Sequence, residues 1–217
     1  MSQTHAAVEA PPKASPAIRR LGRTAYRYRQ SFQLITLAIA LLLGRSLGSR
    51  QSDLTLLWVS MALVALGGGI RSWAMGHHTW RRVYDSPAKE RSLVTAGPYA
   101  LTRNPLYLGT FLIGAGIAAN SGWPILLAVF VPLFVVAHFL IIRWEESKLI
   151  DEFPGQFPRY TAEVPRLFPG LRRSSVRTGS FDLPTMIRTM EPIKTAGFIV
   201  VLVLMYWLKV SGYTPAF

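Results

Sequence analysis

The sequence contains no cysteine, which excludes thiol catalysis, cysteine-ligated metal sites, disulfides and palmitoylation. Acidic residues are also scarce: eleven Asp and Glu stand against 24 Lys and Arg, giving a formal charge of +13. Charged residues make up only 16% of the 217 residues, whereas half of the chain is hydrophobic. A soluble nucleic-acid-binding protein with this net charge would be far more polar. We therefore expect no nucleic-acid partner.

The N-terminal region lacks the apolar core and cleavage site of a signal peptide. We predict that residues 1–30 form a polar, basic arm whose first half is disordered. Residues 18–29 carry five arginines and two tyrosines. This composition fits either a segment lying on an anionic leaflet or a solvated tail that obeys the topology rules.

Long apolar segments dominate the remainder, at 31–47, 54–75, 106–119, 123–142 and 193–210. A helix needs roughly 20 residues to cross the hydrocarbon core, and the second, fourth and fifth segments satisfy this comfortably. The short third segment is joined to the fourth by Asn-Ser-Gly, which indicates a tight helical hairpin. The sequence predicts an all-α, polytopic transmembrane bundle of about five helices, forming one membrane domain over residues 31–217.

Basic residues are distributed unevenly among the connecting segments. Six lie in residues 1–30, six in 71–105 and nine in 143–194, whereas the other turns and the C-terminus hold three. The positive-inside rule therefore predicts an integral membrane protein, in a bacterial inner membrane, with its N-terminus inside and its C-terminus outside. Residues 143–192 become a cytoplasmic segment on the same side as the loop before residue 106.

That loop is the stretch Gly97–Gly109, GPYALTRNPLYLG, where polar sequence gives way to an apolar segment. It holds two prolines, two glycines and two tyrosines within thirteen residues, which indicates a loop of defined shape. Pro105 suits the first turn of a helix that Asn104 would cap. The pattern fits a binding site at the membrane surface, or an ordinary turn between helices.

The fourth apolar segment runs directly into RWEESKLIDEF, residues 143–153. Its composition favours continuation of the helix until Pro154 stops it. Glu145 and Glu146 then lie at the membrane rim. They are suited to a cationic ligand, or Glu145 simply pairs with Lys148 or Arg143 at helical spacing.

Together these two stretches resemble the isoprenylcysteine carboxyl methyltransferase and phospholipid methyltransferase superfamily. The first signature corresponds to Gly97-Pro98-Tyr99 and to residues 103–109. The second is similar in Glu145, Glu146, Leu149, Phe153, Tyr160, Val164, Pro165 and Arg166. The resemblance covers residues 93–169. This chain departs from the isoprenylcysteine enzymes at Asn104, where they usually have histidine, and from the family pattern at Pro154 and Phe157. These departures leave the implied cofactor largely unaffected, but they leave open which substrate the resemblance implies.

The resemblance implies S-adenosylmethionine as the cofactor, bound in a cytoplasmic site. Glu145 and Glu146 suit its ammonium group and Arg103 its carboxylate. The complete set of implied cofactor-binding residues is Leu93, Val94, Gly97, Tyr99, Arg103, Asn104, Pro105, Tyr107, Leu108, Glu145 and Glu146. The candidate catalytic residues are Arg166, Arg143 and Glu146, with an arginine holding a carboxylate acceptor; Arg166 alternatively pairs with a phospholipid phosphate. No metal site is expected.

The acceptor implied by the resemblance is a lipophilic or lipidated molecule from the bilayer, with membrane lipids as the surroundings. An isoprenylcysteine carboxylate or related lipid acceptor is one candidate, and a phospholipid amine is another. A catalytically silent membrane scaffold of the same fold is an alternative of a different class. A transporter is disfavoured because His138 and Arg71 are its few intramembrane polar candidates. His138 either touches the ligands or bonds a neighbouring helix.

Overall fold

The computed structural model describes residues 11–29, 35, 38, 53–77, 93–170 and 177–211. Every regular element in these ranges is a helix, so the all-α prediction is confirmed. The elements are α1 Pro16–Arg27, α3 Leu54–His77, the 3-10 helix η2 Gly97–Ala100, α5 Pro105–Asn120, α6 Pro124–Glu152, α7 Phe157–Glu163, α8 Leu183–Arg188 and α9 Glu191–Val210.

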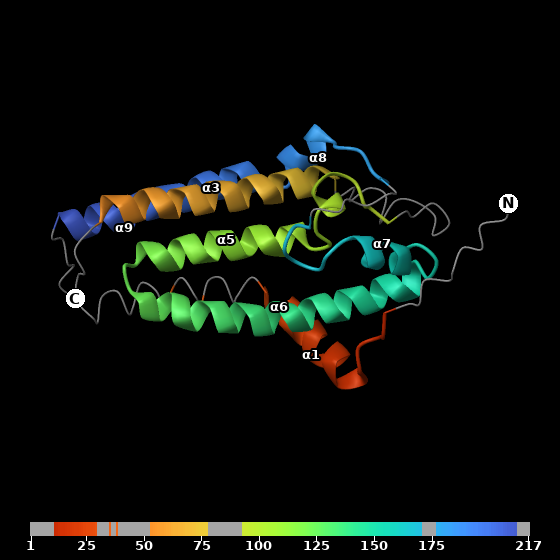
Figure 1. Cartoon of the computed structure of the whole chain (residues 1–217). Coiled ribbons are helices and arrows are strands. Elements are labelled where there is room, and N and C mark those ends of the chain that lie inside the picture. The colour runs from red at the N-terminus through yellow and green to blue at the C-terminus, as the bar shows by residue number, and fades with distance from the viewer. Residues whose placement is uncertain are drawn as a thin grey trace.

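Four apolar helices, α3, α5, α6 and α9, lie alongside one another as an elongated bundle (Figure 1). Helix α3 packs between α5 and α9, and α5 also contacts α6. Helices α3, α6 and α9 are long and apolar enough to cross a membrane, while the 16-residue α5 is shorter. Valines and a phenylalanine of α6 remain exposed at Val135, Val136 and Phe139, as expected for side chains that contact lipid.

The observed boundaries follow the predicted segments closely. Helix α6 continues without interruption from its apolar part through Glu152, which confirms the predicted extension beyond residue 142. The hairpin between α5 and α6 turns at Ser121 and Gly122, and Gly122 has a φ of 75°. The segment at 31–47, expected to form the first membrane helix, lies outside the described residues except at 35 and 38.

Small residues allow α3 to approach its two neighbours. A Cβ on Gly67 would lie 2.5 Å from the carbonyl oxygen of Gly109 in α5, and a Cβ on Gly109 would lie 2.6 Å from that of Gly67. On the other side of α3, Gly68 faces Thr195 of α9. The Gly67-Gly68 pair therefore serves helix packing, as is common in membrane bundles.

The described part of the N-terminal arm is folded onto α6. Ser15 caps α1 by accepting a hydrogen bond from the Ile18 amide, and Pro16 opens the helix. Gly22 packs on the backbone of Leu140, and the rings of Tyr26 and Trp144 lie 4.9 Å apart. Helix α1 is thus docked beside the bundle, with residues 11–15 leading into it.

Candidate functional site

The loop before α5 is held in one shape by its own backbone. Gly97 has a φ of 60°, and a side chain there would overlap the imidazole of His77 at the end of α3, so glycine is required on both counts. The turn η2 follows, with the amides of Leu101 and Thr102 both donating to the Pro98 carbonyl, each at 3.1 Å. This is the defined loop that the sequence predicts.

Helix α5 begins at Pro105, with Asn104 in the cap position. The Asn104 side chain makes no capping hydrogen bond, however. Its amide nitrogen donates to the Arg166 carbonyl at 2.8 Å. The prediction that Asn104 occupies the cap position is therefore confirmed, but the prediction that its side chain caps the helix is wrong. The side chain instead connects the loop to the segment around Arg166.

The two signature stretches lie side by side. The Arg103 amide donates to the Pro165 carbonyl at 2.9 Å, and the Gly170 amide donates to the Leu101 carbonyl at 3.1 Å. Between them, the Thr102 hydroxyl donates to the Leu167 carbonyl at 2.8 Å. Residues 101–104 and 165–170 therefore form one backbone-bonded unit at a single end of the bundle.

Glu146 sits at the centre of this unit with a side chain that is 9% exposed. Arg166 donates to it in a bidentate manner, with Nε at 3.2 Å and Nη2 at 2.9 Å from the two carboxylate oxygens. Arg103 approaches from the other motif, with Nη1 at 3.1 Å from Glu146 Oε1. Two cations thus share one carboxylate, leaving a net positive charge in a largely buried place.

Arg103 has further bonding capacity. Its Nε is buried and makes no hydrogen bond among the described residues. The pKa of Arg103 is lowered, mainly because burial disfavours the charged guanidinium. The negative charge of Glu146 opposes this shift, and the positive charge of Arg166 adds to it. An unbonded guanidinium nitrogen next to excess positive charge is suited to a carboxylate ligand, because a charged acceptor would satisfy both.

Tyr160 of α7 holds the loop through a hydrogen bond to Tyr99. The Tyr160 hydroxyl donates to the Tyr99 carbonyl at 2.7 Å. Burial raises the pKa of both tyrosines, so their hydroxyls stay neutral, and the Tyr160 hydroxyl acts as a donor. Tyr160 belongs to a small core that consists of Leu93, Ile150, Phe157, Tyr160 and Val164.

Leu93 and Val94 contact a different set of residues from the Glu146 cluster. The Leu93 side chain is buried in that small core, and Val94 lies next to Gly179. The amides of Thr95 and Ala96 both donate to the Thr178 carbonyl. The expected contact of residues 93–94 with adenine stays a prediction.

The neighbouring acid, Glu145, faces another group of side chains. It accepts a hydrogen bond from the Tyr107 hydroxyl at 2.9 Å. The Tyr107 ring lies edge-on to His138, with centroids 5.2 Å apart, and His138 stacks on Phe134 at 3.6 Å. Successive residues of a helix point about 100° apart, so the two acids serve two separate clusters.

Arg143 belongs to neither cluster. Its Nη2 lies 3.4 Å from the Pro12 carbonyl, and Ser147, one turn further along α6, accepts from the Ala14 amide. The structure therefore unites Glu146 and Arg166 among the candidate catalytic residues and places Arg143 on the α1 side of α6. In the described ranges, no three His, Asp or Glu side chains gather as metal ligands.

Sequence reasoning missed Thr102 and Tyr160 as site residues. Both act through hydrogen bonds to carbonyl groups far along the chain. Tyr160 belongs to the second signature, and this could have identified it as a site residue. No local pattern distinguishes Thr102 from any other loop threonine.

The comparisons with known proteins agree with these motifs. The phospholipid methyltransferase family matches residues 55–155, which include α3 from its second residue, the shaped loop, α5, Glu145 and Glu146. The nickel-cobalt-cadmium resistance protein NccN of Alcaligenes xylosoxydans xylosoxydans is 35% identical over 151 residues, 66% of this chain and 67% of that protein. The cobalt-zinc-cadmium resistance protein CzcN of Cupriavidus metallidurans is 36% identical over 114 residues, 52% of each chain. No solved structure matches.

Proposed function

Since this chain belongs to the membrane methyltransferase superfamily of the phospholipid and isoprenylcysteine carboxyl methyltransferases, we propose that it is an S-adenosylmethionine-dependent methyltransferase. We propose further that it acts on a lipophilic acceptor that enters from the bilayer. The observation that carries the proposal is the Glu146 cluster, which consists of Glu146, Arg103 and Arg166. Both signatures converge there, and the buried Arg103 Nε has no hydrogen-bond partner in the part of the chain that the structure describes.

The residues present fit the cofactor. In the proposal, Arg103 binds its carboxylate through the unbonded Nε, and Glu146 offers a carboxylate to its ammonium group. Bound S-adenosylmethionine would supply an electrophilic methyl group. The Tyr99–Tyr160 hydrogen bond and the backbone pairing of residues 101–104 with 165–170 hold the loop in place before any ligand arrives, and preorganisation reduces the cost of ordering on binding.

For an amine acceptor, the proposal rests on the Glu145 cluster, which consists of Glu145, Tyr107 and His138. The Tyr107 side chain of α5 meets two residues of α6: its ring lies against His138 in the apolar part of that helix, and its hydroxyl donates to Glu145 further along. An amine acceptor must lose a proton, and Glu145 is the carboxylate placed to accept it. A carboxylate acceptor needs no base and would use Arg166 to hold its charge. The chemistry in both cases depends mainly on alignment, which can supply about 7–11 kcal/mol.

In this proposal the protein resides in a bacterial inner membrane with the Glu146 cluster in the cytoplasm, as the distribution of basic residues favours.

The two relatives are named as resistance proteins, NccN for nickel, cobalt and cadmium and CzcN for cobalt, zinc and cadmium. We propose that the methylated product contributes to growth under such metal stress. A strain lacking the gene should then grow more poorly than its parent in cadmium or cobalt, and equally well without added metal.

Calorimetry of the purified protein in detergent tests the enzyme directly. We expect S-adenosylmethionine to bind, and Glu146→Ala to weaken binding at least tenfold, about 1.4 kcal/mol. Absence of any heat of binding would favour the catalytically silent scaffold. An unchanged dissociation constant in the variant would remove Glu146 from the site.

The fate of a labelled methyl group tests the acceptor. Membranes incubated with methyl-labelled S-adenosylmethionine should yield label in an organic-extractable product. Label found only in water-soluble small molecules would contradict entry from the bilayer. Mass spectrometry of the extract then separates the two acceptor chemistries, because an ester product releases its methyl group on mild base treatment and an N-methylated amine retains it.

A further inference from the structure

Helix α1 is fixed to α6 by polar contacts along its beginning. The Ala14 amide donates to the Ser147 hydroxyl at 3.1 Å, and Arg19 Nη2 donates to Asp151 at 3.0 Å. Lys13 bonds the same carboxylate. These contacts hold α1 in one orientation on the last turns of α6, so the outward face of α1 is a defined surface.

The position of α1 corresponds to a membrane boundary. Its contacts on α6 run from Leu140 to Asp151, and the apolar part of α6 ends at Ile142. A helix docked over this transition lies at the depth of lipid headgroups when α6 crosses the bilayer.

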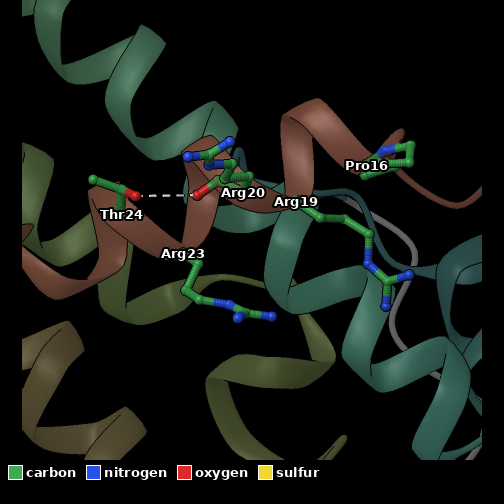
Figure 2. A pocket seen from close by; sticks show the side chains of 6 residues that line it. Pro16, Arg19, Arg20, Arg23 and Thr24 are labelled. Atoms are coloured by element: carbon green, nitrogen blue, oxygen red, sulfur yellow. Dashed lines mark hydrogen bonds between the residues drawn. The ribbon is translucent and has the colours of Figure 1, made fainter.

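The outward face of α1 is strongly basic. Arg20, Arg23 and Arg27 are exposed, and none of them makes an ion pair within the described ranges. Figure 2 shows Arg19, Arg20 and Arg23 extending from neighbouring turns around a surface cavity. This cavity has a volume of about 560 Å³ and is lined by Ala14, Pro16, Arg19, Arg20, Arg23 and Thr24.

An apolar strip runs beside the arginines. Leu21 is 55% exposed and Tyr28 is 57% exposed. These residues are seven apart, so they lie on the same side of the helix. Arginines next to exposed leucine and tyrosine are the arrangement of helices that rest in the interface of a bilayer. A soluble polyanion would match the charges and leave the apolar strip in water.

We propose that the α1 arginine face, defined as Arg20, Arg23 and the cavity around them, binds the phosphate group of an anionic phospholipid. Guanidinium groups suit phosphate because they can donate two parallel hydrogen bonds to it. Leu21 and Tyr28 would contact the acyl region of the same lipid. The site is separate from the Glu146 cluster, because none of that cluster's residues lines the cavity.

Lipid titration of the full-length protein, followed by native mass spectrometry, tests the proposal. We expect phosphatidylglycerol to bind at least tenfold more tightly than phosphatidylcholine. The double variant Arg20→Gln/Arg23→Gln should lose this preference. Both arginines are exposed, so their loss leaves the α1–α6 contacts intact, and an unchanged unfolding temperature verifies that the variant is folded.

A matched control is the double variant Arg159→Gln/Arg188→Gln, which removes two exposed arginines from α7 and α8. Its preference for phosphatidylglycerol should stay within twofold of the parent protein. Equal loss in both double variants would overturn the proposal, since general charge would then explain binding. Equal affinity for the two lipids in the parent protein would overturn it as well. Displacement of phosphatidylglycerol by millimolar inorganic phosphate would show a free-anion site and overturn the assignment to lipid.

Discussion

Two buried carboxylates in this molecule are each held by two cations, yet they differ in how completely their partners are bonded. Glu146 joins the loops at one end of the bundle through Arg103 and Arg166. Glu191 joins α9 to α3 through Arg71, whose Nε and Nη2 donate to its two oxygens at 2.7 and 3.0 Å, with Lys194 at 3.1 Å.

The difference lies in the remaining donors. Arg71 directs Nη1 to the Thr110 hydroxyl at 2.6 Å, so each of its three nitrogens has a partner. Arg103 keeps a buried Nε that has no partner among the residues that the structure describes. A buried polar group left unbonded costs about 1–3 kcal/mol, which a fold tolerates more readily where a ligand later satisfies it. We interpret the Glu191 cluster as structural and the Glu146 cluster as a binding site.

The largest expected effect is on stability. Glu191→Gln leaves Arg71 without its counter-charge in a mostly buried position, and breaking such a pair costs about 3–5 kcal/mol. Unfolding in detergent should occur at markedly lower denaturant concentration. Affinity of the folded protein for S-adenosylmethionine should stay within threefold. A large loss of affinity at unchanged stability would reverse our assignment of the two clusters.

A somewhat smaller effect on stability, and a larger one on binding, is expected for Glu146→Gln. Arg166 is 36% exposed and can be hydrated, so we expect a destabilisation of about 1–3 kcal/mol. The dissociation constant for S-adenosylmethionine should rise at least tenfold. Equal effects of Glu146→Gln and Glu191→Gln on both stability and affinity would abolish the distinction between the clusters.

The substitution Arg103→Lys tests the role of the unbonded Arg103 Nε. Lysine keeps the charge near Glu146 but cannot provide the guanidinium fork. We expect the affinity for S-adenosylmethionine to fall about tenfold, or about 1.4 kcal/mol, with little change in the unfolding midpoint. As a control, Arg71→Lys should alter the midpoint and leave the affinity unchanged. Unaltered binding by Arg103→Lys would assign the cofactor carboxylate to another group.

The smallest effect is expected from Tyr160→Phe. This change removes the hydrogen bond to the Tyr99 carbonyl and leaves the ring in its core. A net loss of about 1 kcal/mol is typical of one such bond. It should appear partly as weaker cofactor binding, because the loop is less firmly held. Tyr206→Phe, on α9, serves as the control and should leave cofactor binding unchanged.

The helices and their order could be predicted from sequence because hydrophobic runs and proline positions are local signals. Pro105 and Pro154 mark the start of α5 and the end of α6 accurately. In lipid, the backbone polar groups of a spanning segment must be hydrogen-bonded within that segment. An apolar run of sufficient length is therefore expected to form a helix. The docking of α1 on α6 was not predictable in this way, since it depends on Gly22 meeting Leu140 and Trp144.

The sequence by itself determined the residue types of the site and the two stretches that contain them. Tertiary structure decided which side chains meet: it separated Glu145 from Glu146, removed Arg143 from the cluster and paired Asn104 with a carbonyl 62 residues away. It also revealed Glu191 as the partner of Arg71, 120 residues along the chain. The physical reason is that charge pairing and hydrogen bonding depend on distances of about 3 Å, and such distances between remote segments are fixed by packing of the whole bundle.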